Sequence, residues 1–322
     1  MNCLCCGRPL KESASEQTNL WHKSCIRKFF ATEELPELDI SDEGLNRIVT
    51  EAAGRGYTIP GVQKKLSLHL ESSGLPRLTV VDYPNGYILK PQSEDYPSLP
   101  EAEHLVMRMA EKTGIRVVPF GLLRSEDQKS FSYITRRIDR SITGKKKQSV
   151  QKIAMEDFCQ LDGKLTADKY HGSYERCAKI VLRYSRNPGL DLSELYLRLV
   201  FSFVTGNSDM HLKNFSLFET VSGSRQYGLS PAYDLLPVNL ILPEDQEQTA
   251  LTINGKKRNL HKNDFLKFAH TSGINEKAAD NLIAKVIKMQ DRYHTLCRDS
   301  WLPEDMQTAF IELMDQRIES LK

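Results

Sequence analysis

The part of the sequence that decides the fold reads GNSDMHLKNFS, from Gly206 to Ser216. It follows a long apolar run from Leu195 to Val204, which predicts a buried helix, and it precedes two short apolar segments that end at Asp234. Polar and ionisable side chains beside a rigid apolar element are typical of a functional loop. Asp and Asn are also common turn residues, so an ordinary turn is the alternative interpretation.

Asp209 and Asn214 lie five positions apart in this stretch, and Asp234 ends the triplet AYD that follows. This is the order and spacing of a kinase catalytic loop, in which the Asp accepts the proton of the attacking hydroxyl and the Asn holds a metal ion. A later Asp holds the metal ion that bridges the phosphates. The pattern therefore predicts phosphoryl transfer, with Asp209 as base and Asn214 and Asp234 as metal ligands.

Composition and charge limit the classes of protein to which this chain can belong. The chain has 322 residues, of which 40% are hydrophobic and 27% charged, and this is typical of a globular protein with two lobes. The net charge of +2 gives no global basic field that would favour nucleic acid. Because no apolar run is long enough for a membrane span and no signal-peptide pattern opens the chain, we expect a cytoplasmic protein.

Four of the seven cysteines lie within the first 25 residues. Cys3 and Cys6 form a C-x2-C pair, and His22 and Cys25 form an H-x2-C pair. Two chelating pairs separated by a short loop predict a closed, structural Zn²⁺ site, because so short a segment buries too little apolar surface to fold alone. Cys5 in place of Cys6 is an open alternative, as is a set of unconnected reduced thiols.

Residues 45–140 carry the signals of a small antiparallel sheet with one helix. Asn85-Gly86 predicts a hairpin between the strands that flank it. The expected elements are strands at 66–70, 78–81, 87–90, 117–123 and 131–135 and a helix at 100–112.

Lys90 ends one of these strands, and Glu103 lies near the start of the helix. A helix glutamate that reaches a strand lysine is the ion pair of a kinase nucleotide site. The alternatives are a solvated lysine and a glutamate that stabilises the helix N-terminus. The glycine-bearing stretch 54–65 precedes the first strand and can let backbone N–H groups approach phosphates, although it lacks the Walker A pattern and can equally be an ordinary turn.

Residues 141–322 are expected to be mostly helical. The order of elements predicts an α+β, two-lobed, protein-kinase-like fold, with a zinc-ribbon-like segment at 1–35, a small antiparallel-sheet N-lobe at 45–140 and a helical C-lobe at 141–322. The expected features of the C-lobe are a basic loop at 141–151, a helical start at 156–160, a capping box at 191–194, a β-ribbon of 215–218 with 226–229, and single amphipathic helices through 279–293 and 306–321.

Four segments of the sequence resemble the HipA toxin kinases. They are TIPGVQKKLS (Thr58–Ser67), the stretch Gly206–Ser216, LSPAYD (Leu229–Asp234) and LTINGK (Leu251–Lys256). The resemblance covers about residues 50 to 300. It implies a bacterial serine/threonine protein kinase of the toxin–antitoxin type, which uses ATP and Mg²⁺.

The resemblance also implies roles for individual residues. Asp209 would be the catalytic base and Asn214 and Asp234 the magnesium ligands, with His211 and Lys213 lining the catalytic loop. The implied nucleotide-binding residues are Lys90 with its partner Glu103, the phosphate-covering loop of Gly61, Val62 and Gln63, the adenine-side hinge from Arg136 to Ile138, and Asp139 near the ribose.

Regulation and partners follow from the same resemblance. In the family, autophosphorylation of a serine just before the phosphate-covering loop expels the loop and turns the kinase off. Thr58 occupies this position here, and Pro60 replaces a second serine seen in HipT-type loops, which argues against a two-site switch. HipA itself phosphorylates an aminoacyl-tRNA synthetase and is restrained by HipB, a helix-turn-helix DNA-binding antitoxin.

One departure from the family concerns the N-terminus, where HipA carries a further subdomain before the loop and this chain has about 50 residues. The chain is therefore closer to the short HipT-like kinases, whose missing subdomain can be a separate small protein. The expected partners are a protein substrate such as an aminoacyl-tRNA synthetase or another translation protein, a HipB-like antitoxin and a HipS-like subunit, with no membrane and with DNA contacted only through the antitoxin. A kinase-fold phosphotransferase that acts on a small molecule and a non-catalytic, nucleotide-regulated binding module are the alternative functions.

Overall fold

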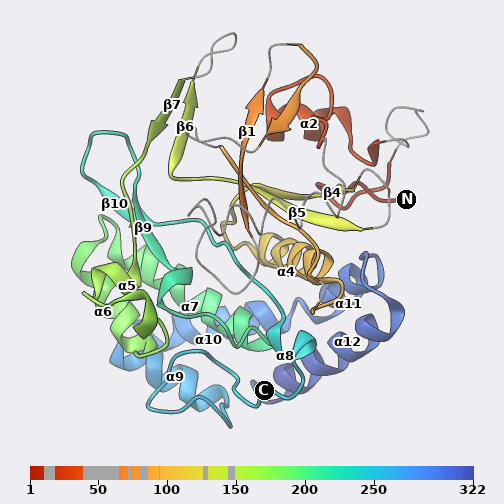
Figure 1. Ribbon diagram of the computed structural model, residues 1–322. Helices are drawn as coiled ribbons and strands as arrows, with labels where there is room; N and C mark the ends of the chain where they lie inside the picture. Colours follow the sequence, from red (N-terminus) through yellow and green to blue (C-terminus); the bar gives the residue numbers. More distant parts are fainter. Residues whose placement is uncertain are drawn as a thin grey trace. The chain divides into compact units, whose positions relative to one another are not determined.

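The structure is a computed structural model, and it describes residues 1–10, 19–38, 65–71, 74–79, 86–93, 95–125, 130–143 and 149–322. The chain divides into two compact units (Figure 1). Unit 1 comprises residues 1–104, 118–152 and 299–301, and unit 2 comprises residues 105–117, 153–298 and 302–322. Unit 1 is built on an antiparallel sheet and unit 2 is mainly helical, so the predicted α+β class is confirmed.

A five-stranded antiparallel sheet is the framework of unit 1, and its strand order is β2-β1-β3-β5-β4. The strands are β1 (Leu66–Glu71), β2 (Arg77–Thr79), β3 (Tyr87–Lys90), β4 (Phe120–Arg124) and β5 (Phe131–Arg136). Leu66, Leu68 and Leu70 are buried and alternate with more exposed residues, as the period of two predicts.

The predicted hairpin between 78–81 and 87–90 is wrong. Strands β2 and β3 do not pair with each other, because β1 lies between them and pairs antiparallel with both. His69 is opposite Thr79 on one side of β1, and Leu66 is opposite Leu89 on the other. The Asn-Gly pair is a local sequence signal. Which strand pairs with which depends on all the strands of the sheet, and a local signal does not contain this information.

Residues that precede the sheet in the sequence cover both of its edges. The N–H of Leu122 on β4 donates to the carbonyl of Leu4 (2.9 Å), and the N–H of Leu78 on β2 donates to the carbonyl of Glu37 (3.0 Å). Edge strands expose unpaired backbone groups that promote association with other chains. The N-terminal segment therefore satisfies backbone groups at both edges of the sheet.

The basic loop predicted at 141–151 is wrong at its two ends, which are strands and not loop. Strands β6 (Arg140–Thr143) and β7 (Ser149–Lys152) pair antiparallel as a separate two-stranded ribbon. The polar composition of this stretch hid the pairing, because a two-stranded ribbon need not carry an apolar face. The lysines at 145–147 lie outside the described residues.

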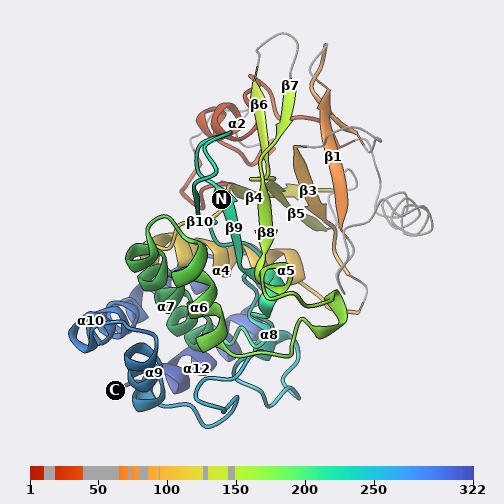
Figure 2. The same ribbon diagram turned by 90° about the vertical axis from the view of Figure 1, so that its left-hand side faces the viewer.

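Helix α7 (Pro188–Val204) is the centre of unit 2. Helices α6, α10 and α12 pack against it (Figure 2), and nearly all of its residues from Leu192 onward are buried. The predicted capping box at 191–194 is wrong: the helix begins at Pro188, which is suited to the first turn because it needs no N–H acceptor, and Asp191 lies inside the helix. The remaining helices of the unit are α5 (Phe158–Leu161), α6 (Tyr174–Tyr184), α8 (Val238–Ile241), α9 (Lys262–Thr271), α10 (Glu276–Ile287), α11 (Gln290–Arg298) and α12 (Glu304–Glu319), and α4 (Leu99–Thr113) contributes to both units.

A three-stranded sheet accompanies these helices in the order β10-β9-β8. The predicted ribbon is present as β9 (Ser216–Glu219) and β10 (Tyr227–Leu229), and β8 (Met155–Asp157) extends it, so the helical start predicted at 156–160 is displaced to Phe158. The single helix predicted through 279–293 is wrong as well, because it is divided into α10 and α11. Within the described residues, no helix has both the length and the apolarity needed to cross a membrane.

Candidate active site and cysteine–histidine cluster

The loop at 206–216 is held at its start by close packing. Gly206 has a φ of 64°, and a Cβ on it would lie 2.7 Å from Cδ2 of Leu313. Its carbonyl accepts a hydrogen bond from the N–H of Asn239 (2.9 Å). Only glycine fits this conformation and this space without a shift of its neighbours.

Asn214 and Asp209 occupy the two ends of a tight turn. The Oδ1 atom of Asn214 accepts from the N–H of His211 (3.0 Å), where the short 3₁₀ helix Leu212–Asn214 begins. The N–H of Asp209 donates to Oδ1 of Asn207 (3.2 Å), and the Asp209 carboxylate accepts from the hydroxyl of Tyr170 (2.6 Å). The Asp209 side chain is therefore in position to accept a proton from a hydroxyl group.

Asp234 lies in the segment that follows β10. Its φ of 60° is unusual for a residue with a side chain and is the kind of local strain that clusters at functional sites. Burial lowers the pKa of His211, and the charges of Asp209 and Asp234 partly offset this effect. Both carboxylates therefore act on the same imidazole, although they lie far apart in the sequence. Carboxylate and amide oxygens are the ligands that Mg²⁺ prefers, so the donor pair of Asn214 and Asp234 fits this ion.

The side chain of Lys213 reaches the start of α5. Its Nζ forms an ion pair with Oδ2 of Asp157 (2.6 Å), and Asp157 also caps α5 by accepting from the N–H of Gln160. Lys213 thus connects the loop to a neighbouring helix.

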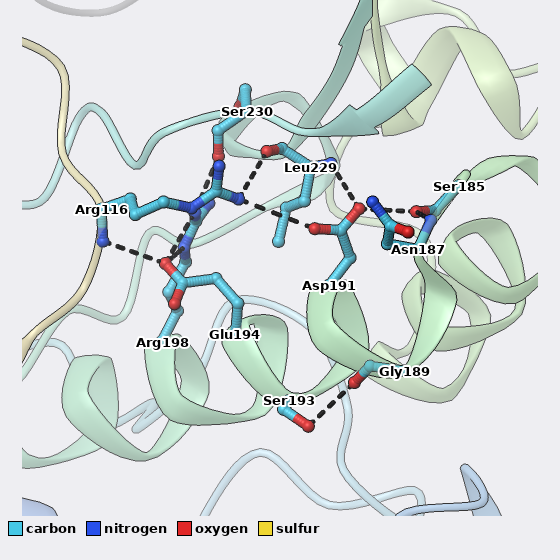
Figure 3. Close-up of polar contacts among 10 residues, drawn as sticks. All are labelled: Arg116, Ser185, Asn187, Gly189, Asp191, Ser193, Glu194, Arg198, Leu229 and Ser230. Carbon is cyan, nitrogen blue, oxygen red and sulfur yellow. Dashed lines mark hydrogen bonds and ion pairs between the residues drawn. The ribbon is translucent and has the colours of Figure 1, made fainter. Parts of the chain in front are cut away.

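Sequence reasoning missed a polar network that holds the backbone ahead of Asp234 (Figure 3). The N–H of Leu229 donates to Oδ2 of Asp191 (2.8 Å), and the same oxygen accepts from the hydroxyl of Ser185 (2.6 Å). The carbonyl of Leu229 accepts from Arg116 (3.0 Å), whose guanidinium lies 3.6 Å from Oδ1 of Asp191.

Arg198 completes the network from the interior of α7. Its Nη2 donates to the carbonyl of Ser230 (2.7 Å) and pairs with Glu194 (2.9 Å), and its side chain is only 1% exposed. Glu194 also accepts from the N–H of Arg116 (3.1 Å). The network binds backbone groups of Leu229 and Ser230, so it fixes the path of the chain independently of those two side chains. A charged residue inside a predicted apolar helix was the sequence signal that could have revealed it.

In unit 1, Lys90 and Glu103 form a buried ion pair. Lys90 Nζ lies 2.6 Å from Oε1 of Glu103, and the two side chains are 4% and 0% exposed. Lys90 Nζ also lies 5.2 Å from the ring centre of Tyr133 on the neighbouring β5. Buried charges persist only when they are paired, so the alternative of a solvated Lys90 does not apply, and the Glu103 carboxylate pairs with this lysine.

The predicted hinge begins where β5 ends at Arg136. Asp139 accepts two hydrogen bonds from Arg137 (2.9 and 2.7 Å) and one from Arg140 (2.6 Å). Burial raises the pKa of Asp139, but the hydrogen bonds and charges of the two arginines outweigh it, so the pKa is lowered. Asp139 is thus ionised and engaged by its neighbours, and Ile138 lies beside it. The predicted residues Thr58, Gly61, Val62 and Gln63 lie outside the described residues.

The side chains of Cys3, Cys6, His22 and Cys25 meet in unit 1, with one ligand atom from each lying within 4.8 Å of all the others. Nε2 of His22 is 3.0 Å from the carbonyl of Pro9, and because a carbonyl only accepts, Nε2 carries the proton. Nδ1 is left as the ligand atom, 3.3 Å from Sγ of Cys6 and 3.9 Å from Sγ of Cys25. Three thiols and one imidazole with a fixed tautomer fit tetrahedral Zn²⁺.

Cys5 lies outside this group of four, and its Sγ faces the carbonyl of Phe120 on β4 (3.8 Å). Trp21, which precedes His22, donates from Nε1 to the carbonyl of Leu122 (2.9 Å). Its ring lies so close to Gly121 that a Cβ there would be 2.6 Å away. The cluster therefore lies beside β4, the edge strand that the N-terminal residues cover.

A family model described as "HipA-like C-terminal domain" matches residues 57–293. The chain belongs to this family. The match begins after the cysteine–histidine cluster, and it includes the loop at 206–216, Asp234, Lys90 and Glu103.

Several curated proteins are similar to this member of the HipA-like family. A "Putative kinase" of Haemophilus influenzae is 27% identical over 289 residues, which are 84% of this chain and 82% of that protein. "Putative kinase Y4mE" of Sinorhizobium fredii is 31% identical over 228 residues (69% and 52%), and the "Serine/threonine-protein kinase toxin HipA" of Shewanella oneidensis is 28% identical over 206 residues (59% and 45%). The chain thus spans about half the length of the latter two relatives.

Two solved structures share the fold. One is the Shewanella oneidensis complex of HipA, HipB and operator DNA, with a TM-score of 0.70 and 19% identity over 89% of this chain and 73% of that chain. The other is the Helicobacter pylori proinflammatory kinase CtkA, with a TM-score of 0.52 and 14% identity over 76% of this chain and 90% of that chain. The predicted kinase-like fold class is therefore confirmed.

Proposed function

We propose that this protein is a HipA-like serine/threonine protein kinase that transfers the γ-phosphate of ATP to a protein hydroxyl. The observation that carries the proposal is the turn from Asn207 to Asn214, in which the Asp209 carboxylate accepts a hydrogen bond from a hydroxyl group (2.6 Å) and Oδ1 of Asn214 accepts from the N–H of His211 (3.0 Å). Phosphoryl transfer requires positioning, a base and metal-binding oxygens, and Asp209, Asn214 and Asp234 are the candidates for the base and the metal ligands. Membership of the HipA-like family supports the same activity.

In this proposal Asp209 accepts the proton of the attacking hydroxyl, and Asn214 and Asp234 hold Mg²⁺. The metal would neutralise charge that develops on the phosphates. Lys90, held by Glu103, binds phosphate oxygens, and Gly61, Val62 and Gln63 cover them. Burial lowers the pKa of His211 and so favours its neutral form, and Lys213 anchors the turn through Asp157. Arg136, Ile138 and Asp139 line the adenine and ribose side.

The test uses the purified full chain with γ-labelled ATP, Mg²⁺ and dephosphorylated casein. Label should appear on casein or on the chain itself, should disappear with excess EDTA, and should be abolished by Asp234→Ala. Label transfer that survives both treatments would contradict the assigned metal ligands. Turnover of ATP with label found on a small molecule and never on protein would favour the small-molecule phosphotransferase, and nucleotide binding without any turnover would favour the binding module.

The toxin role and its control are part of the same proposal. Thr58 would be the autophosphorylation site, and a HipB-like antitoxin, with a HipS-like subunit, would restrain the kinase. The structure of the Shewanella oneidensis complex, in which HipA is found with HipB and operator DNA, supports this partner. Induced expression should arrest growth, and co-expression of a neighbouring helix-turn-helix protein should relieve the arrest. Phosphopeptide mapping that finds phosphate elsewhere and none at Thr58 would contradict the proposed autophosphorylation switch.

The cysteine–histidine cluster would hold one structural Zn²⁺ through Cys3, Cys6, His22 and Cys25. The support is the convergence of these four ligand atoms and the fixed tautomer of His22. Elemental analysis of reduced protein purified without chelators should give about one zinc per chain. Protein that is folded, active and free of metal would defeat this assignment.

A further inference from the structure

Tyr170 belongs to a segment that lies along the candidate catalytic turn. The N–H of Leu212 donates to the carbonyl of Lys169 (3.2 Å), and the hydroxyl of Tyr174 donates to the carbonyl of Met210 (2.9 Å). Between these two backbone anchors, the hydroxyl of Tyr170 donates to Oδ1 of Asp209 (2.6 Å). The segment is thus placed against the turn at three successive points.

The two tyrosines of this segment differ in how firmly they are held. Tyr174 is 1% exposed and its hydroxyl reaches a backbone carbonyl, so it is a fixed anchor. Tyr170 is 38% exposed, and its ring is in edge contact with His211 (5.0 Å) and lies under the amino group of Lys169 (4.8 Å). Rotation of the Tyr170 side chain would therefore free the Asp209 oxygen without disturbing Tyr174.

The Tyr170 hydroxyl makes the contact that a substrate hydroxyl has to make. A general base must lie within about 2.6–3.2 Å of the hydroxyl oxygen whose proton it accepts. Burial and the bond to Asp209 raise the pKa of Tyr170, so its hydroxyl stays protonated and remains a donor. The same hydrogen bond occupies the Asp209 oxygen that a substrate hydroxyl would have to reach. Both effects oppose reaction while Tyr170 is in place.

We infer that the Tyr170 hydroxyl occupies the acceptor-hydroxyl position at Asp209 and that Tyr170 selects the substrates that can displace it. This inference rests on the proposed kinase function and names the acceptor position of the same site. When a serine or threonine hydroxyl takes the place of Tyr170, its oxygen forms a bond to the γ-phosphorus, the bond from that phosphorus to ADP breaks, and the hydroxyl proton passes to Asp209. A flexible acceptor segment that can enter beside the turn is the class of substrate that this arrangement favours.

The test compares Tyr170→Phe with wild type in the full chain, with dephosphorylated casein as acceptor. Removal of one hydroxyl should lower KM for casein and raise kcat/KM about tenfold, because the competing hydrogen bond to a charged group is lost. KM for ATP should not change. A fall in kcat would show that Tyr170 orients the base, and an unchanged kcat/KM would show that it has no role; either result overturns the inference.

Tyr184→Phe is the matched control, since Tyr184 is 39% exposed in the same unit and lies at the end of α6. It should behave as wild type in every assay. Calorimetric binding of casein to the chain loaded with Mg²⁺ and a non-hydrolysable ATP analogue provides a readout without turnover. Tighter binding by Tyr170→Phe supports the inference even if wild type transfers no phosphate, in which case only the proposed activity fails. Equal binding together with normal transfer rejects the inference alone.

Discussion

The cysteine–histidine cluster and the loop at 206–216 are both short and irregular, yet they are held in place by different means. In the cluster, four ligand-type side chains from two nearby stretches meet within 4.8 Å of one another. The loop is fixed by close packing at Gly206, by hydrogen bonds at Asn214 and by anchors from remote parts of unit 2. A metal would stabilise the first region, whereas burial around α7 stabilises the second.

Two regions of one chain are therefore expected to depend on different interactions for their stability. Zinc binding should control the edge of the sheet in unit 1, where Leu4 and Trp21 meet β4. Core packing should control the loop in unit 2, because α7 leads directly into it. The first two of the following experiments each change one region and measure both, and the last two each probe a single unit.

The largest effect is expected from Cys6→Ser combined with Cys25→Ser. Loss of two of four ligands should reduce the zinc content from about one per chain to near zero and expose β4 to hydrogen exchange. Exchange in α7 should stay as in wild type. Cys5→Ser is the control and should retain zinc, because Cys5 faces Phe120. Loss of zinc in the Cys5→Ser variant would show that the ligand set is wrong.

Phe201→Ala should have the reciprocal effect. Phe201 is fully buried on α7 and its ring lies against Tyr293 (6.1 Å), so the cavity should lower the free energy of unfolding by about 3–5 kcal/mol. Denaturant unfolding followed by hydrogen exchange should locate the loss in unit 2. The zinc content should not change, and a parallel loss of zinc would show that the two regions are not independent.

Asp191→Asn should have a smaller and more local effect. The Asp191 carboxylate accepts from Leu229 and Ser185 and faces Arg116, and an amide can replace only part of these interactions. We expect a loss of about 1–3 kcal/mol in the free energy of unfolding and faster exchange at 226–235. Ser193→Ala on the same helix is the control, because its hydroxyl bonds only within α7. Unchanged exchange near Asp234 would mean that the network does not hold this segment.

The smallest effect concerns pH and belongs to unit 1. Burial raises the pKa of Glu101, at the start of α4, to about 7. The folded state then binds more protons than the unfolded state, so this group's contribution to stability is present below about pH 4.5 and is lost as the pH rises through about 7. Glu101→Gln should stabilise the protein by about 1 kcal/mol at pH 8 and not at pH 4. Equal shifts in Tm at both pH values would contradict this.

The comparison also explains how much could be predicted from the sequence. Cys3, Cys6, His22 and Cys25 were predicted as a group because the spacing of chelating pairs is local. Lys90 and Glu103 were identified by the order of motifs, and the structure places them 2.6 Å apart. The α+β class followed from the hydrophobic periodicity, which is a local property as well.

The features that were missed depend on contacts between remote residues. Strand β1 separates β2 from β3, although the local Asn-Gly signal favoured a direct hairpin. Asp191 resembled a helix cap, but its carboxylate binds the backbone of Leu229, 38 positions away. Tyr170 precedes Asp209 by 39 positions in an exposed segment with no recognisable motif. Tertiary contacts therefore override the local signals at the first two sites, and at Tyr170 there was no local signal to read.

The most direct test of the central claim is the rate of label transfer by Asp209→Asn at saturating Mg-ATP. The substitution keeps the size of the side chain and removes its ability to accept a proton, so transfer should fall by about 10²–10⁴-fold while nucleotide affinity and Tm stay close to wild type. A variant that transfers label at the wild-type rate would show that Asp209 is not the base.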